Sequence, residues 1–259
     1  RAFVIILFWF LRLRNALNPA EYLHEFLTGD CLLCPSIARV RASGVDIPLG
    51  YIQHPYPNIQ MLYYETIEPQ TLELLRKLQE IPSLRKTRLV GGTSLALQIG
   101  HRKSIDLDFF GEVDGDNDAL AEDLKTLGNL MVLRASSHIH VYLLNNIKID
   151  IVDYAYPWLN EAIRIDGIQL AGLTDIAAMK LAAITGRGTK KDFIDLYFLS
   201  RRFSLSEMQS FYERKYPDGS MFMVLKSLSY FEDAEQDPSP YMLEAIDWEE
   251  IKYHILSLL

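Results

Sequence analysis

The sequence contains little cysteine and no excess of positive charge. Both cysteines, Cys31 and Cys34, lie in the first 60 of its 259 residues, so no disulfide can support the remainder, which fits a reducing cytoplasm. The single Cys-x-x-Cys pair lacks the second ligand pair of a zinc site and the strand–helix context of a redox motif. The formal net charge is −8, which argues against a generally basic nucleic-acid-binding protein, so any contact with RNA needs a local basic patch.

Long apolar runs and two common catalytic motifs are missing as well. Residues 2–11 are apolar, but this stretch is too short to cross a bilayer, and we expect no membrane partner. The chain has neither the Gly-x-Ser-x-Gly elbow of a serine hydrolase nor the Walker lysine loop of a P-loop enzyme. Both of these enzyme classes are therefore disfavoured.

Composition changes near residue 61. All seven methionines and all eleven lysines lie at or after Met61, whereas both cysteines precede it. We therefore expect residues 1–60 to be a non-native or poorly ordered N-terminal extension, translated from upstream sequence, and the working protein to begin at Met61. The alternative is a targeting segment, although no basic region precedes residues 2–11 and no clear small-residue cleavage site follows them.

The most informative segment is residues 88–110, which read RLVGGTSLALQIGHRKSIDLDFF. A short apolar strand leads into a double glycine, and a short helix then begins at a hydroxyl pair and ends at Gly100. Glycines let a phosphate approach the backbone, and the free N–H groups of a helix start attract anions. The segment therefore predicts a phosphate-binding turn formed by Gly91, Gly92, Thr93 and Ser94.

Two aspartates follow this turn in a predicted strand. Because side chains alternate between the faces of a strand, Asp106 and Asp108 point to the same face. Two neighbouring carboxylates repel unless a cation lies between them, and divalent metals take oxygen ligands of this kind. The alternative is a helix–turn–strand unit that leaves both aspartates solvated.

A third acid comes from a later strand. Asn145 and Asn146 form a two-residue hairpin signal, and the strand that follows, residues 147–154, places its isoleucines on one face. Asp150 lies on the opposite face and is the candidate third carboxylate, with Asp153 as the alternative. An exposed strand aspartate without a metal is the third possibility.

The second informative segment, residues 174–200, predicts two helices around a glycine turn, with Thr174 and Thr189 as their N-caps. Lys180 lies in line with apolar residues on the first helix, so it either extends to the surface or meets an anion. Asp192 and Asp195 share one face of the second helix. An ion pair between Lys180 and Asp192 that braces the turn is the structural alternative.

Together the two segments resemble the AbiEii toxin family of polymerase-beta-like nucleotidyltransferases, which includes the MenT tRNA-modifying toxins. The resemblance covers residues 61–259. It implies an α+β fold in which a mixed-sheet nucleotidyltransferase domain with helices, residues 61–172, precedes a C-terminal helical domain, residues 173–259, and we expect a ligand crevice between the two. It also implies that Lys180 contacts the triphosphate and that Asp192 assists the site.

The implied activity is transfer of a nucleotide from an NTP to an RNA end, in particular of tRNA, by an enzyme that a cognate antitoxin restrains. Two Mg²⁺ ions would be held by Asp106, Asp108 and Asp150, and the phosphate-binding turn would grip the triphosphate. Two alternatives stay open, namely nucleotidylation of a small molecule such as an antibiotic, and a nucleotide-binding sensor without catalysis.

The remaining pattern completes the expected fold. His101, Arg102 and Lys103 either complement a helix end or contact a phosphate, and His138 and His140 lack the further ligands of a zinc site. Ser204 and Glu207 form a capping box. We expect helices at residues 69–80, 119–127, 221–231 and 247–258, strands at 131–135, 138–144 and 147–154, and a turn at 114–118.

Overall fold

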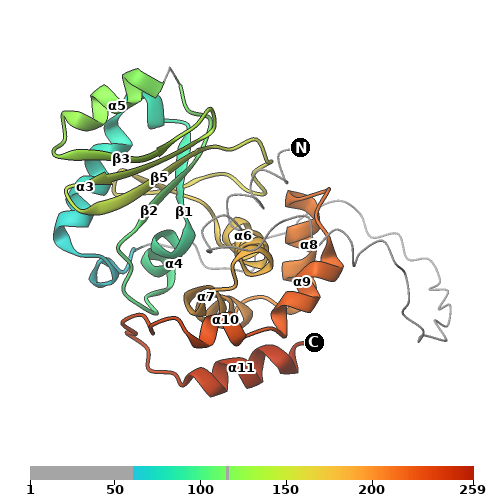
Figure 1. Ribbon diagram of the computed structural model, residues 1–259. Coiled ribbons are helices and arrows are strands. Elements are labelled where there is room, and N and C mark those ends of the chain that lie inside the picture. The colour runs from blue at the N-terminus through green and yellow to red at the C-terminus, as the bar shows by residue number, and fades with distance from the viewer. Residues whose placement is uncertain (1–60, 115–116) are drawn as a thin grey trace. The chain divides into compact units, whose positions relative to one another are not determined.

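The computed structural model describes residues 61–114 and 117–259 (Figure 1). The expectations for residues 1–60, including Cys31 and Cys34, and for the middle of the turn at 114–118 lie outside this range. Within it, seven strands form one mixed sheet in the order β3-β4-β5-β2-β1-β7-β6. Their bounds are β1 Thr87–Val90, β2 Leu107–Gly111, β3 Leu130–Ala135, β4 Ile139–Leu144, β5 Ile147–Asp153, β6 Ile163–Ile165 and β7 Ile168–Leu170.

The centre of the sheet determines where the functional side chains lie. β2 pairs antiparallel with β1 on one side and parallel with β5 on the other, while β3, β4 and β5 form an antiparallel meander. The parallel pairing joins strands that are far apart in the sequence. The predicted α+β class with a mixed sheet is confirmed.

The hairpin between β4 and β5 forms as its sequence indicates. Asn145 and Asn146 have φ values of 51° and 66°, and two consecutive positive φ values define the turn type whose twist matches that of the flanking strands. The side chain of Asn145 also accepts a hydrogen bond from the backbone N–H of Asn129 at 2.9 Å. This local turn fixes the register that places Asp150 on one face of β5.

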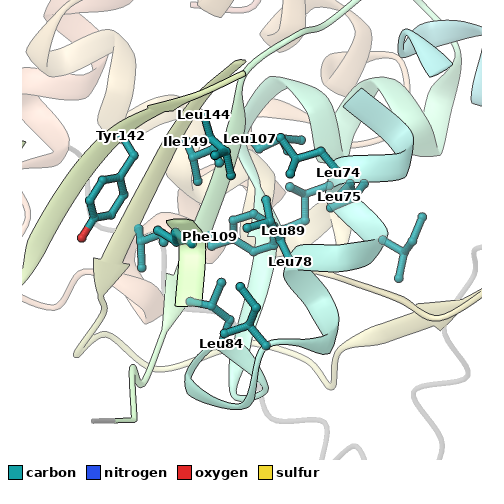
Figure 2. Close-up of a cluster of buried hydrophobic side chains, with 14 of the residues drawn as sticks. Leu74, Leu75, Leu78, Leu84, Leu89, Leu107, Phe109, Tyr142, Leu144 and Ile149 are labelled. Carbon is teal, nitrogen blue, oxygen red and sulfur yellow. The ribbon is translucent and has the colours of Figure 1, made fainter. Parts of the chain in front are cut away.

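One face of the sheet carries the main hydrophobic core (Figure 2). The helix α3, Pro69–Glu80, presents a stripe of leucines to the sheet at the spacing of an amphipathic helix, and α5, Asn117–Lys125, contributes Leu120 and Leu124. From the strands, every second residue joins the core. The central members of this cluster are Leu74, Leu75, Leu78, Leu89, Leu107, Phe109, Tyr142, Leu144 and Ile149.

Helices follow the sheet in the second half of the chain. α6, Leu173–Gly186, packs against α4, Gly91–Ile99, and against three later helices. The capping box of Ser204 and Glu207 begins α8 as predicted. The later helices are α7 Lys190–Ser200, α8 Leu205–Lys215, α9 Met221–Leu228, α10 Glu232–Glu235 and α11 Trp248–Ser257, and the short 3₁₀ turns are η1 Tyr64–Thr66 and η2 Pro82–Leu84.

Several local expectations were wrong in detail. β6 and β7 were not predicted, because three residues are too few to show a strand alternation. Helix α6 begins at Leu173 with Gly172 as its N-cap, since the hydroxyl of Thr174 is occupied by the side chain of Asn160. Helix α4 begins at Gly91, ahead of the hydroxyl pair. Helix α9 ends at Leu228, and the short α10 follows it.

Among the helices formed by residues 61–114 and 117–259, none has the length and apolar character needed to cross a membrane.

Successive side chains of β2 point to opposite faces of the sheet, and two variants can test this assignment. Replacing Phe109 with alanine removes a fully buried ring and should lower the free energy of unfolding by about 3–5 kcal/mol, the usual range for such a cavity. Phe110, the next residue, faces the other side of the sheet and is only partly buried, so F110A should lose less. Chemical denaturation of both variants checks this, and equal losses would contradict the assignment of the two faces.

Candidate active site

A cleft lies on the sheet face opposite the main core. It encloses about 150 Å³ and is bounded by the start of α4, by β2 and β5, and by α6 and the beginning of α7. The two informative sequence segments thus meet at one place. Six of the predicted site residues line this cleft, namely Gly91, Gly92, Asp106, Asp108, Asp150 and Lys180.

The parallel pairing of β2 and β5 brings two of the predicted acids together. Asp108 is the register partner of Asp150, so their side chains leave neighbouring strands on the same face. Loss of solvent in the cleft raises the pKa of Asp108 to about 6, and the charge of Asp150 adds to this effect. The apposition therefore costs free energy while both groups are charged and no cation lies beside them.

Asp150 is the more deeply placed of the two. Its side chain is 3 % exposed, and its Oδ2 accepts a hydrogen bond from Lys148 Nζ at 2.7 Å. Its Oδ1 is buried and has no hydrogen-bond partner among the described residues. Burial raises the pKa of Asp150, and Lys148 partly opposes that rise. The alternative candidate, Asp153, is 43 % exposed, pairs with His138 at 3.1 Å and does not line the cleft.

The carboxylate oxygens of the cleft are ligands of the type that a hard divalent cation prefers. The three aspartates do not, however, converge on one position. In residues 61–114 and 117–259, no three acidic, histidine or cysteine side chains form a complete metal-ligand group. Asp106 instead lies beside Lys191, with Nζ 3.6 Å from Oδ2. The unpartnered Oδ1 of Asp150 and the uncompensated charge of Asp108 nevertheless offer the carboxylate oxygens that Mg²⁺ and similar ions bind.

The two glycines allow the start of α4 to approach these acids. Gly91 has a φ of 68°, and a Cβ there would collide with the carboxylate of Asp108. A Cβ on Gly92 would collide with the guanidinium of Arg102. Helix α4 has no side-chain cap at its N-cap, Val90, and helix starts whose first N–H groups are not satisfied by a cap attract anions.

The hydroxyl groups of Thr93 and Ser94 lie beneath the cleft rather than in its wall. Thr93 is almost fully buried, and its hydroxyl donates to the backbone carbonyl of Asp106 and lies 2.8 Å from Ser104 Oγ. Ser94 Oγ accepts a hydrogen bond from Gln98 at 3.1 Å. Thr93 thus connects the glycine turn to Asp106, which precedes β2 rather than lying within the strand as predicted.

A buried charge network forms the wall of the cleft opposite the acids. Asp192 accepts hydrogen bonds from Lys180 Nζ at 3.0 Å, Arg187 Nε at 2.7 Å and Thr189 Oγ1 at 2.5 Å. Burial alone would raise the pKa of Asp192, but Arg187 and Lys180 hold it far below its usual range. Lys180 therefore makes the predicted ion pair and lines the cleft at the same time.

Asp195 extends the network toward the glycine turn. It binds Arg102 through Nε at 2.7 Å and Nη2 at 2.9 Å, and it also contacts His101 Nε2 at 2.8 Å and Lys180 Nζ at 2.5 Å. Burial lowers the pKa of His101 although Asp195 opposes this. Arg102 thus sits between Asp195 and Gly92, whereas Lys103 turns outward to Glu68.

Sequence reasoning left two parts of this network unassigned. Arg187 lies in the glycine turn after α6, and nothing in its local pattern distinguishes it from a surface arginine. The pairing of Arg102 with Asp195 joins residues 93 positions apart. The placement of Asp195 on the same helix face as Asp192 is the one signal from which a second cation could have been inferred, and no such cation was predicted from the sequence.

The cleft has two chemically different ends. Three aspartates and five cationic side chains line it, so the cleft suits a polyanion although the whole chain is acidic. The other end is apolar and aromatic. The cations are Arg102, Lys148, Lys180, Arg187 and Lys191, and the apolar end includes Phe110, Ile139, Val152, Tyr154, Met179 and Tyr216.

The charge of Asp108 should depress stability when no metal is present. Its pKa in the folded protein is about 6, above that of the unfolded chain, so the penalty is absent below about pH 4, grows as the pH rises and is complete above about pH 7. In chelator, D108N should therefore be more stable than the wild type by about 1–3 kcal/mol at pH 8 and equally stable at pH 4.

Thermal unfolding at both pH values measures this difference. D106N is the matched control, because the side chain of Asp106 is 34 % exposed and its removal should change the unfolding temperature less. A D108N protein that is less stable than the wild type at pH 8 would contradict the proposed repulsion.

Comparison with known proteins agrees with the geometry. Residues 73–259 match the family model described as nucleotidyl transferase AbiEii toxin, type IV TA system. The uncharacterized protein aq_aa25 of Aquifex aeolicus (strain VF5) is 35 % identical over 196 residues, which cover 72 % of this chain and 92 % of that protein.

Two solved structures are also similar. The nucleotidyltransferase toxin MenT4 of Mycobacterium tuberculosis H37Rv has a TM-score of 0.51 and 15 % identity, over 73 % of this chain and 82 % of that one, and it shares the fold. JHP933 of Helicobacter pylori has a TM-score of 0.44 and 20 % identity, over 74 % and 91 %. The family match spans most of the chain and both informative segments, and the chain belongs to the AbiEii nucleotidyl transferase toxin family.

Proposed function

We propose that this chain transfers a nucleotide from an NTP to the end of an RNA, in particular a tRNA, with the help of two Mg²⁺ ions, and that a cognate antitoxin restrains it. The observation that carries the proposal is the apposition of Asp108 and Asp150 near the glycine turn, in a cleft that five cationic side chains also line. Family membership supports nucleotidyl transfer in a toxin system. The cytoplasm is the compartment that fits this substrate.

Asp106, Asp108 and Asp150 are the residues that would hold the metal. Bound there, Mg²⁺ would supply Lewis-acid activation of the acceptor hydroxyl and of the triphosphate. Thr93 fixes the backbone at Asp106, and the register of β2 and β5 fixes Asp108 against Asp150. The buried Oδ1 of Asp150, which has no partner in the described part of the chain, is open to a ligand.

The remaining wall binds and orients the nucleotide. The N–H groups at Gly91 and Gly92, together with those of Thr93 and Ser94, would receive the β- and γ-phosphates. Lys180 would neutralise the charge that develops on them, and Asp192 positions it through their 3.0 Å contact. The aromatic end of the cleft offers a stacking surface for a nucleobase.

The acceptor follows from the charge at the rim of the cleft. Lys148 and Lys191 are 41 % and 45 % exposed, so they can contact phosphates outside the cleft. An RNA backbone provides such phosphates next to its terminal hydroxyl. A neutral or cationic small molecule would not use this rim.

Labelled transfer tests the acceptor directly. The protein is incubated with each α-³²P-labelled NTP, Mg²⁺ and total tRNA, and we expect label on tRNA with at least one NTP. Label on a small molecule only would support the antibiotic-modifying alternative. Saturable NTP binding without transfer to tRNA, protein or small acceptors would support the sensor and overturn the proposal.

Asp150 and Asp153 form a matched pair for the third carboxylate. D150N should lower transfer by roughly 100-fold or more, since it removes an inward-facing ligand of the metal. D153N should leave the rate within about twofold, because Asp153 is directed to His138 outside the cleft. Circular dichroism confirms folding of both, and a larger loss in D153N than in D150N would reject Asp150 as the ligand.

A further inference from the structure

The ammonium group of Lys148 lies against one of the carboxylates that would hold the metal. Lys148 and Asp150 are two residues apart on β5, so both side chains leave the same face of the strand. Nζ lies 2.7 Å from Asp150 Oδ2. The carboxylate is thus already engaged by a cation that belongs to the chain itself.

The other cations of the cleft are held elsewhere. Lys180 and Arg187 contact Asp192, Arg102 is bidentate on Asp195, and Lys191 lies beside Asp106. Among the described residues, Lys148 is the cationic side chain that reaches Asp150 at hydrogen-bond distance. Its charge also opposes the rise of the pKa of Asp108 that burial and Asp150 cause.

Lys148 differs from the buried cations in its freedom to move. Its side chain is 41 % exposed, whereas that of Lys180 is 5 % exposed and that of Asp150 is 3 % exposed. A long unbranched side chain at a cleft rim can leave its partner without unpacking any core residue. The contact between Lys148 and Asp150 is therefore exchangeable.

We propose that Lys148 is an internal competitor for the divalent-cation site, which holds Asp150 while the cation is absent and must release it when the cation binds. The inference rests on the proposed function, because it takes Asp108 and Asp150 as ligands. The consequence is a site that binds free cation weakly. Asp150 Oδ1 is unpartnered among the described residues, but an ammonium on Oδ2 and a divalent cation on Oδ1 of the same carboxylate would repel each other at close range, so the lysine has to move away before the cation can bind tightly.

Mn²⁺ alone is the probe, titrated into the full chain by calorimetry without nucleotide. K148M keeps most of the side-chain volume but removes the ammonium, and it should bind Mn²⁺ roughly tenfold more tightly, the scale of one charge-assisted hydrogen bond that no longer has to be broken. K148R keeps the charge and should remain near the wild-type affinity. An affinity in K148M equal to or weaker than that of the wild type would overturn the proposal.

K191M is the matched control for a neighbouring cation that makes no hydrogen bond. Lys191 lines the same cleft with similar exposure, but its Nζ is 3.6 Å from Asp106 Oδ2, beyond hydrogen-bond distance. Its removal should therefore tighten binding less than removal of the Lys148 ammonium. Equal gains in K148M and K191M would show a general electrostatic effect and would overturn the competition.

The same titration separates failure of this inference from failure of the proposed function. Binding by the wild type that D150N abolishes, with no gain in K148M, would leave the metal site standing and reject the competitor. Absence of Mn²⁺ binding in both the wild type and K148M would reject the metal site and the competitor together. In K148M/D150N the gain should disappear, because Lys148 acts through Asp150.

Discussion

The pairing of Asp192 and Asp195 with their buried cations is the interaction on which the cleft depends. Two ionised carboxylates without solvent contact are tolerated only when several donors surround them, and here the donors come from different segments. Lys180 lies on α6, Arg187 in the turn after it, and Arg102 between α4 and β2. The network therefore joins the helices of the second half to the glycine turn of the first.

The aspartates of α7 and those of the sheet differ in how far neighbouring cations compensate their charge. Those on α7 are fully compensated and serve to fix cations, so their pKa values lie far below the usual range. Those on the sheet face the cleft with incomplete compensation, so the pKa values of Asp108 and Asp150 are raised. Uncompensated charge of this kind is common in ligand-binding sites, because a ligand can relieve it.

The chain has a net negative charge, yet cationic side chains line its cleft. A bound ligand would experience mainly the charges nearest to it, so the net charge of the chain does not determine the potential in the cleft. Glycine at positions 91 and 92 removes the side chains that would separate the helix start from the acids and from Arg102. Lys148 completes the arrangement by placing a cation 2.7 Å from Asp150 Oδ2. The glycine turn, the aspartates of the sheet and the cations that balance them thus meet in one small set of contacts.

The sequence by itself determined the strand–glycine–helix–strand unit, the hairpin at Asn145 and Asn146, and the face of β5 that carries Asp150, because each follows from local spacing and turn chemistry. It also carried the family resemblance, which the family match confirms. Only the tertiary structure decided that Asp150 rather than Asp153 enters the cleft, that Thr93 and Ser94 are buried, and that Arg102 and Arg187 bind Asp195 and Asp192. These facts depend on the parallel pairing of β2 with β5 and on packing between distant helices, and neither is encoded in any local pattern.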